Sequence, residues 1–125
     1  MVIYDELAEK FGKTVADAVR AMTLNRDLPS STDQVRDSLK RIRKQPREVW
    51  AVKLADGIAA TNMVPRDWSE ARRERHLSEI TQNRMVLDEL RNASPYLARR
   101  LAENLALWDE AARNAASAAE QERTR

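Results

Sequence analysis

Apolar residues recur three and four positions apart along most of the chain, and clusters of Gly, Pro, Asn, Asp or Ser interrupt this pattern. That period is typical of amphipathic helices, and no alternation of apolar and polar residues lasts long enough to predict a strand. The pattern predicts helices at residues 4–11, 14–22, 31–45, 47–63 and 69–93, and from 94 to beyond 108. We therefore expect an all-α helical bundle.

Helix start and stop signals divide the pattern at these places. Gly12 is a favoured residue just past a helix end, and Pro46 both ends one helix and suits the first turn of the next. Ser94, followed by proline, is a strong start signal. The predicted caps are Thr14, Ser31 or Thr32, Ser69 and Ser94. Apolar stripes are predicted on the second helix (Val15, Ala18, Val19, Met22) and on the last (Leu97, Leu101, Leu105, Trp108).

Size and composition limit the classes of protein that fit. The chain has 125 residues, no cysteine and a formal net charge of +2 with both signs dispersed. This predicts one small domain over residues 4–110 and a charged, alanine-rich tail over 111–125, with no disulfide or thiolate metal site. No apolar run is long enough to span a membrane, and the first residues lack the basic and apolar segments typical of a signal peptide, so we expect a cytoplasmic protein. Dispersed charge favours no specific nucleic acid partner.

One aspartate stands out within the helix predicted at 47–63. Residues 49–60, V-W-A-V-K-L-A-D-G-I-A-A, are apolar on nearly every side, and their only charges are Lys53 and Asp56. Such a pattern predicts a buried helix. A buried carboxylate is costly unless it is paired or binds a metal ion. Either Lys53 pairs with Asp56, or Asp56 is a metal ligand. Trp50 and Trp108 are predicted core residues.

The sequence around Asp56 resembles a known family. R-E-V-W-A-V-K-L-A-D-G-I, residues 47–58, is similar to the last metal-ligand helix of HD-domain phosphohydrolases. The closest branch is the guanosine polyphosphate (ppGpp) pyrophosphohydrolases, related to the hydrolase domain of the RelA/SpoT proteins. Y-D-E-L-A-E-K-F-G-K-T-V-A, which starts at Tyr4, and D-S-L-K-R-I-R-K-Q-P, which starts at Asp37, resemble the neighbouring segments of that family. The resemblance extends over residues 4–108.

The resemblance implies a bundle that corresponds to the later part of an HD domain. It also implies a role in the stringent response, with ppGpp as substrate and Mn²⁺ as cofactor. Asp56 matches the family's metal ligand, and Lys53 matches the lysine that precedes it. Lys53 and Asn62 are the candidate substrate-binding residues.

The chain also departs from the family's pattern. Gly57 stands where the family has Arg, and Ala60 stands where it has Asn. The family's histidine, His-Asp doublet and Glu-Asp pair precede the segment matched at Tyr4, so we expect an N-terminally truncated domain that is inactive alone. The only histidine, His76, lies in a charged stretch and is predicted at the surface or its boundary. The expected partner is a complementing N-terminal HD segment or a second copy. The alternative function is a helical interaction module without catalysis.

Overall fold

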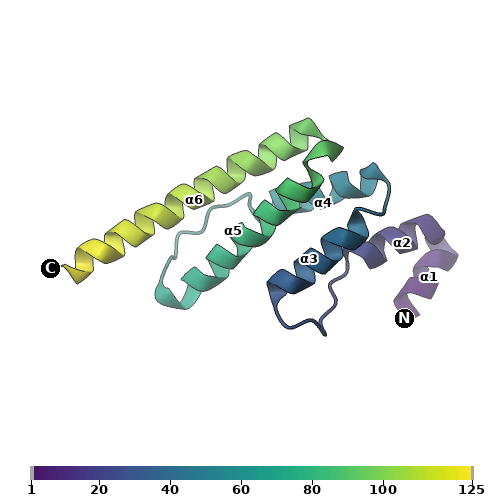
Figure 1. Cartoon of the computed structure of the whole chain (residues 1–125), viewed down its shortest axis with the longest axis horizontal. Helices are drawn as coiled ribbons and strands as arrows, with labels where there is room; N and C mark the ends of the chain where they lie inside the picture. The colour runs from purple at the N-terminus through teal and green to yellow at the C-terminus, as the bar shows by residue number, and fades with distance from the viewer. Residues whose placement is uncertain (1, 125) are drawn as a thin grey trace.

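A computed structural model describes residues 2–124, and this part of the chain contains helices and loops but no strand (Figure 1). The elements are α1 (Val2–Phe11), α2 (Lys13–Met22), α3 (Ser31–Ile42), α4 (Arg47–Ala60), α5 (Glu70–Leu90), the short 3₁₀ helix η1 (Arg91–Ala93) and α6 (Pro95–Arg123). The predicted all-α bundle is confirmed. None of the described helices is long and apolar enough to cross a bilayer.

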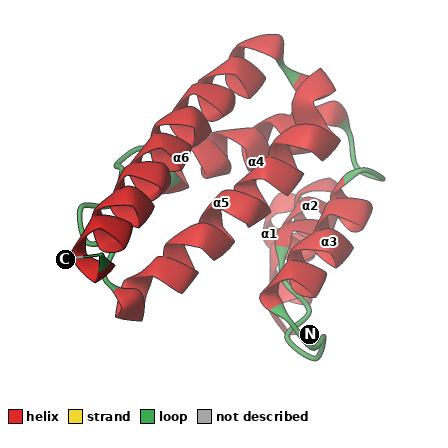
Figure 2. Cartoon of the chain, turned by 60° about the vertical axis from the view of Figure 1, so that its left-hand side comes forward, coloured by secondary structure: helices red, strands yellow, loops and turns green. Residues whose placement is uncertain are grey.

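The helices pack in two groups that share one core. α4, α5 and α6 contact one another, and α5 and α6 run side by side over much of their length (Figure 2). α3 packs on the other side of α5, and the α1–α2 hairpin joins through α2 and α3. The core consists mainly of long aliphatic side chains from α3 to α6: Val35, Leu39, Ile42, Leu54, Val86, Leu87, Leu90, Leu101 and Leu105. Burial of these side chains is the main stabilising contribution to the fold.

Two serine caps fix where helices begin. The Ser94 hydroxyl accepts a hydrogen bond from the Leu97 N–H at 3.2 Å, which confirms the predicted start of α6. The cap of α3 is Ser30, one residue before the predicted Ser31, because the Ser30 hydroxyl accepts from the Asp33 N–H at 3.0 Å. The Ser69 side chain makes no capping hydrogen bond. Hydroxyl caps of this kind satisfy an N–H that has no partner inside the helix.

The hairpin of α1 and α2 depends on a single glycine. Gly12 has a φ of +92°, a left-handed conformation that residues with a Cβ rarely adopt. The chain therefore reverses direction there without a loop, and α2 begins at Lys13 rather than after a Thr14 cap. The stripe predicted on α2 is not the buried one. Val15 and Val19 are exposed, whereas Ala16 and Ala21 are buried.

Several helix ends differ from the prediction, and α3 ends at Ile42 rather than 45 while α5 gives way to η1 after Leu90. α4 ends at Ala60 instead of residue 63, because side chains of α6, Asn104 and Trp108, satisfy the Ile58 and Thr61 carbonyls in place of further helical N–H groups. α6 continues as one helix through residue 110, where the tail was predicted to begin, and reaches Arg123. The alanine-rich composition explains this continuation, since alanine has the highest helix propensity.

Candidate functional site

Asp56 is not buried, and the sequence-based prediction was wrong on this point. Its side chain is 66% exposed, on the side of α4 that faces solvent. The buried side of the helix consists of Leu54 and Gly57, with Trp50 and Ile58 half-buried at its margins. The exposed side carries Val52 and alanines. Alanine was counted as apolar, but its small side chain gains little from burial, so an alanine-rich face can remain in water.

Lys53 pairs with Asp56, which was one of the two predicted alternatives, and the pair is partly exposed to solvent. The Lys53 Nζ lies 3.2 Å from the Asp56 Oδ2, and the two residues are three positions apart on α4. The lysine side chain is 23% exposed, so its stem is partly covered while its charged end reaches the exposed carboxylate. An ion pair in contact with water contributes little to stability, since both charges are well solvated without each other.

We expect Lys53→Met and Asp56→Asn each to change the free energy of unfolding by less than about 1 kcal/mol, because the pair is solvent-exposed. Urea unfolding of both variants, followed by circular dichroism, measures this. A loss of several kcal/mol in Lys53→Met alone would contradict it, since that result requires an Asp56 carboxylate buried in the folded protein.

The described residues do not form a metal site around Asp56. Within residues 2–124, no group of three or more His, Cys, Asp or Glu side chains is placed to hold a metal ion. Asn62 lies in the exposed turn that follows α4. A transition metal ion such as manganese needs several fixed nitrogen or oxygen ligands. The residues present therefore do not by themselves fit a manganese ion.

Trp108 anchors the end of α4 to α6. It is 4% exposed, and its Nε1 donates to the Thr61 carbonyl at 3.0 Å. The Asn104 Nδ2, one turn earlier on α6, lies 3.2 Å from both the Ile58 carbonyl and the Thr61 hydroxyl. These bonds satisfy carbonyls that a helix end leaves without partners. Trp108 is thus a core residue, as predicted, and its contacts keep Asp56 on the outer side of α4.

The other two residues singled out from the sequence lie at the edge of the core. Trp50 is half-buried, and its Nε1 donates to the Gln45 carbonyl at 3.0 Å. His76 is also half-buried, as expected for a boundary residue. Its Nε2 lies 2.9 Å from the Asp67 carbonyl, and its ring packs edge-on against Trp68 and Trp108, with centroids 4.9 and 6.1 Å away. Within residues 2–124, His76 belongs to no group of side chains that could hold a metal ion.

Gly57, which stands where the resembled family has an arginine, lies at a position where helices pack closely. A Cβ placed on it would lie 2.8 Å from the Asn83 Oδ1 and 3.4 Å from the Leu101 Cδ2. The Asn83 amide is itself held, because its Nδ2 donates to the carbonyl and carboxylate oxygens of Glu79. A helix with glycine here can approach α5 and α6 closely. The arginine of the resembled family has no space at this position.

A pocket that the sequence did not predict lies among α1, α2 and α3. Its volume is about 360 Å³, and none of its lining residues comes from α4. The lining includes two arginines and one aspartate, whose spacing along the chain gives no sign that they meet.

The chain matches no known family model, no curated protein and no solved structure, so the assignment of function depends on the residues themselves.

Proposed function

We propose that this chain is the later part of an HD-type phosphohydrolase domain of the ppGpp pyrophosphohydrolase kind. In this proposal Asp56 is one ligand of a manganese site, and the remaining ligands come from a further segment that packs on the exposed side of α4. The observation that supports the proposal most directly is an exposed carboxylate next to exposed apolar side chains. Asp56 is exposed beside Val52, which is 54% exposed, and beside Ala55 and Ala59.

The energetics of this surface favour a covering partner. Val52 and the exposed alanines gain free energy if another helix removes them from water. The same helix would desolvate Asp56, which is unfavourable unless a cation or a hydrogen-bond donor compensates the carboxylate. A partner that brings metal ligands would meet both conditions. Lys53 would then be close enough to contact an anionic substrate, which is the role that the resemblance gives it.

We expect the chain alone to have no ppGpp hydrolase activity, because the described residues supply only one recognisable ligand for the metal. The assay separates ppGpp from its products by anion-exchange chromatography after incubation with Mn²⁺. Asp56→Ala is the matched control, since the substitution lies on an exposed side of α4 and should leave the fold intact. Product formation by the wild-type chain that Asp56→Ala abolishes would overturn this expectation.

A manganese titration tests the ligand count directly. Calorimetry should give the same weak heats for the wild-type chain and for Asp56→Ala, since a single exposed carboxylate is a poor site. A saturable site that disappears in Asp56→Ala would mean that the chain, or a dimer of it, assembles a full set of ligands without another segment.

The same surface favours the alternative function, a helical interaction module without catalysis. Val52 is 54% exposed, and Met63, in the turn after α4, is 81% exposed. Large apolar side chains that are exposed in this way are candidates for contact with a partner protein. A second copy of the chain is the simplest partner, since a two-fold dimer covers each surface with its equivalent.

We expect self-association that depends on this surface. Light scattering behind size exclusion should show a mass above the 14.3 kDa of one chain, and Val52→Glu should shift the protein toward the monomer. Leu107→Glu, on an exposed position of α6, is the control. A monomer at all concentrations, with or without the substitution, would exclude a second copy as the occupant.

A further inference from the structure

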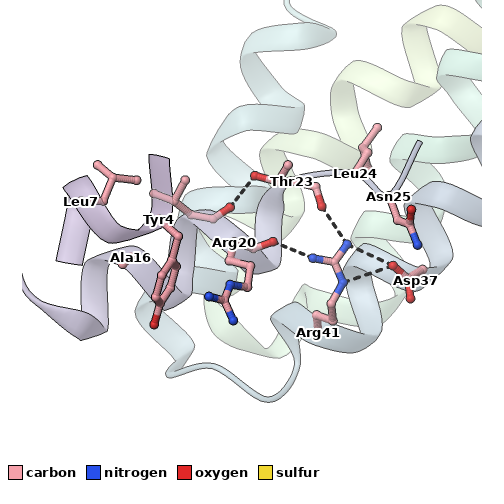
Figure 3. A pocket seen from close by; sticks show the side chains of 10 residues that line it. Tyr4, Leu7, Ala16, Arg20, Thr23, Leu24, Asn25, Asp37 and Arg41 are labelled. Atoms are coloured by element: carbon pink, nitrogen blue, oxygen red, sulfur yellow. Dashed lines mark hydrogen bonds and ion pairs between the residues drawn. The ribbon is translucent and has the colours of Figure 1, made fainter. Parts of the chain in front are cut away.

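The pocket among α1, α2 and α3 is a second candidate binding site, independent of α4. Figure 3 shows side chains from all three helices around it. Its volume of about 360 Å³ falls within the range of small-molecule sites, which are generally apolar with a few fixed polar groups. Most of its wall is apolar: Leu7 from α1, Ala16 and Val19 from α2, and Leu24 from the loop that follows.

One arginine of the pocket is fully occupied by the protein. Arg41 donates through its Nη1 to the Arg20 carbonyl at 2.6 Å and through its Nη2 to the Thr23 carbonyl at 2.7 Å. Its Nε and Nη2 also lie 3.1 and 3.0 Å from the Asp37 carboxylate (Figure 3). Arg41 therefore closes the C-terminal end of α2 and neutralises Asp37, and it has little capacity left for a ligand.

The other arginine is held in place but forms no direct ion pair, although the Asp17 carboxylate lies close enough to interact with its charge. The Arg20 guanidinium lies 3.6 Å from the centre of the Tyr4 ring, and among residues 2–124 its side chain makes no ion pair or hydrogen bond. Tyr4 is fixed in turn, since its hydroxyl donates to the Asp17 Oδ1 at 2.6 Å. Hydrogen bonds from Lys13 and Tyr4 lower the pKa of Asp17, so this anchor persists at neutral pH.

We propose that this pocket binds a small amphipathic carboxylate, whose apolar body fills the space beside Leu7, Val19 and Leu24 and whose carboxylate pairs with Arg20. The formal charge of the lining supports an anion, because Arg20 leaves one positive charge among the lining residues once Arg41 and Asp37 neutralise each other. A guanidinium presents paired donors that match the two oxygens of a carboxylate. The Arg20 guanidinium is already held over the Tyr4 ring, so it loses less conformational freedom when a ligand binds.

Naphthoate is the probe for this site, because it joins an apolar body of suitable size to one carboxylate. We expect calorimetry with the full chain at neutral pH and low salt to show one saturable site. Arg20→Gln should weaken this binding by about tenfold or more, the effect of removing a charge-assisted pair. Naphthalene methanol, which lacks the charge, should bind the wild-type chain more weakly by a similar factor.

Arg100→Gln is the matched control, since Arg100 also lies over a tyrosine ring, that of Tyr96, but outside the pocket. It should bind naphthoate like the wild-type chain. Val19→Phe, which fills the pocket from an exposed position, gives a second test that leaves Arg20 in place. Absence of naphthoate binding, equal binding by Arg20→Gln and Arg100→Gln, or full binding by Val19→Phe would overturn the proposal.

Discussion

Gly57→Arg should unfold the protein or lower its free energy of unfolding by at least about 3 kcal/mol, from overpacking together with the desolvation of a charged group. Even a methyl group at Gly57 would meet the Asn83 Oδ1 at 2.8 Å and the Leu101 side chain at 3.4 Å. An arginine would have to displace both, and the Glu79 carboxylate beside Asn83 already accepts a hydrogen bond from the Asn83 amide. Urea unfolding followed by circular dichroism measures the loss.

Two further variants separate the steric effect from a general effect of substitution in α4. Ala59→Arg adds the same side chain to an exposed position of the same helix and should change stability by less than about 0.5 kcal/mol. Gly57→Ala should be destabilising, although alanine recovers about 1 kcal/mol of helix propensity. Asn83→Ala should relieve part of the loss, since it removes the atom in closest approach. A stable Gly57→Arg would mean that α4 does not pack closely on α5 and α6.

Trp108→Ala should lower the free energy of unfolding by about 3–5 kcal/mol, the usual range for removal of a large buried aromatic side chain. The substitution opens a cavity where α4 and α6 meet and removes the hydrogen bond to the Thr61 carbonyl. Thr61 is 1% exposed, so water does not readily replace that donor. The edge-on contacts of the indole with Trp68 and His76 are lost as well.

Trp108→Phe distinguishes the packing contribution from the hydrogen bond. It retains most of the aromatic volume but leaves the Thr61 carbonyl without its donor, which should cost about 1–3 kcal/mol. Leu107→Ala, an adjacent residue that is 54% exposed, should cost less than about 0.5 kcal/mol. If Trp108→Phe matches the wild-type chain, the hydrogen bond to Thr61 contributes no net stability. A loss below about 1 kcal/mol in Trp108→Ala would contradict its position in the core.

The sequence determined the helices and most of their limits. Local signals were sufficient for this, because a helix depends on residues three and four positions apart, and on caps such as Ser94, whose partner lies three residues away. The apolar period also identified core residues correctly, including Leu101, Leu105 and Trp108. Large apolar side chains gain enough free energy from burial that their spacing alone predicts which side of α6 faces inward.

Tertiary structure decided which side of α4 faces inward, and the sequence alone misplaced Asp56 for that reason. Val52 and several alanines give this helix no clear polar side, so its rotation depends on contacts from distant residues. Asn104 and Trp108 hold its C-terminal carbonyls from 46 and 47 positions away, and Gly57 allows the close approach to α5 and α6. That packing leaves Asp56 in solvent. The contact between Arg20 and Tyr4 depends in the same way on how α2 packs against α1, because no local period encodes contacts between separate helices.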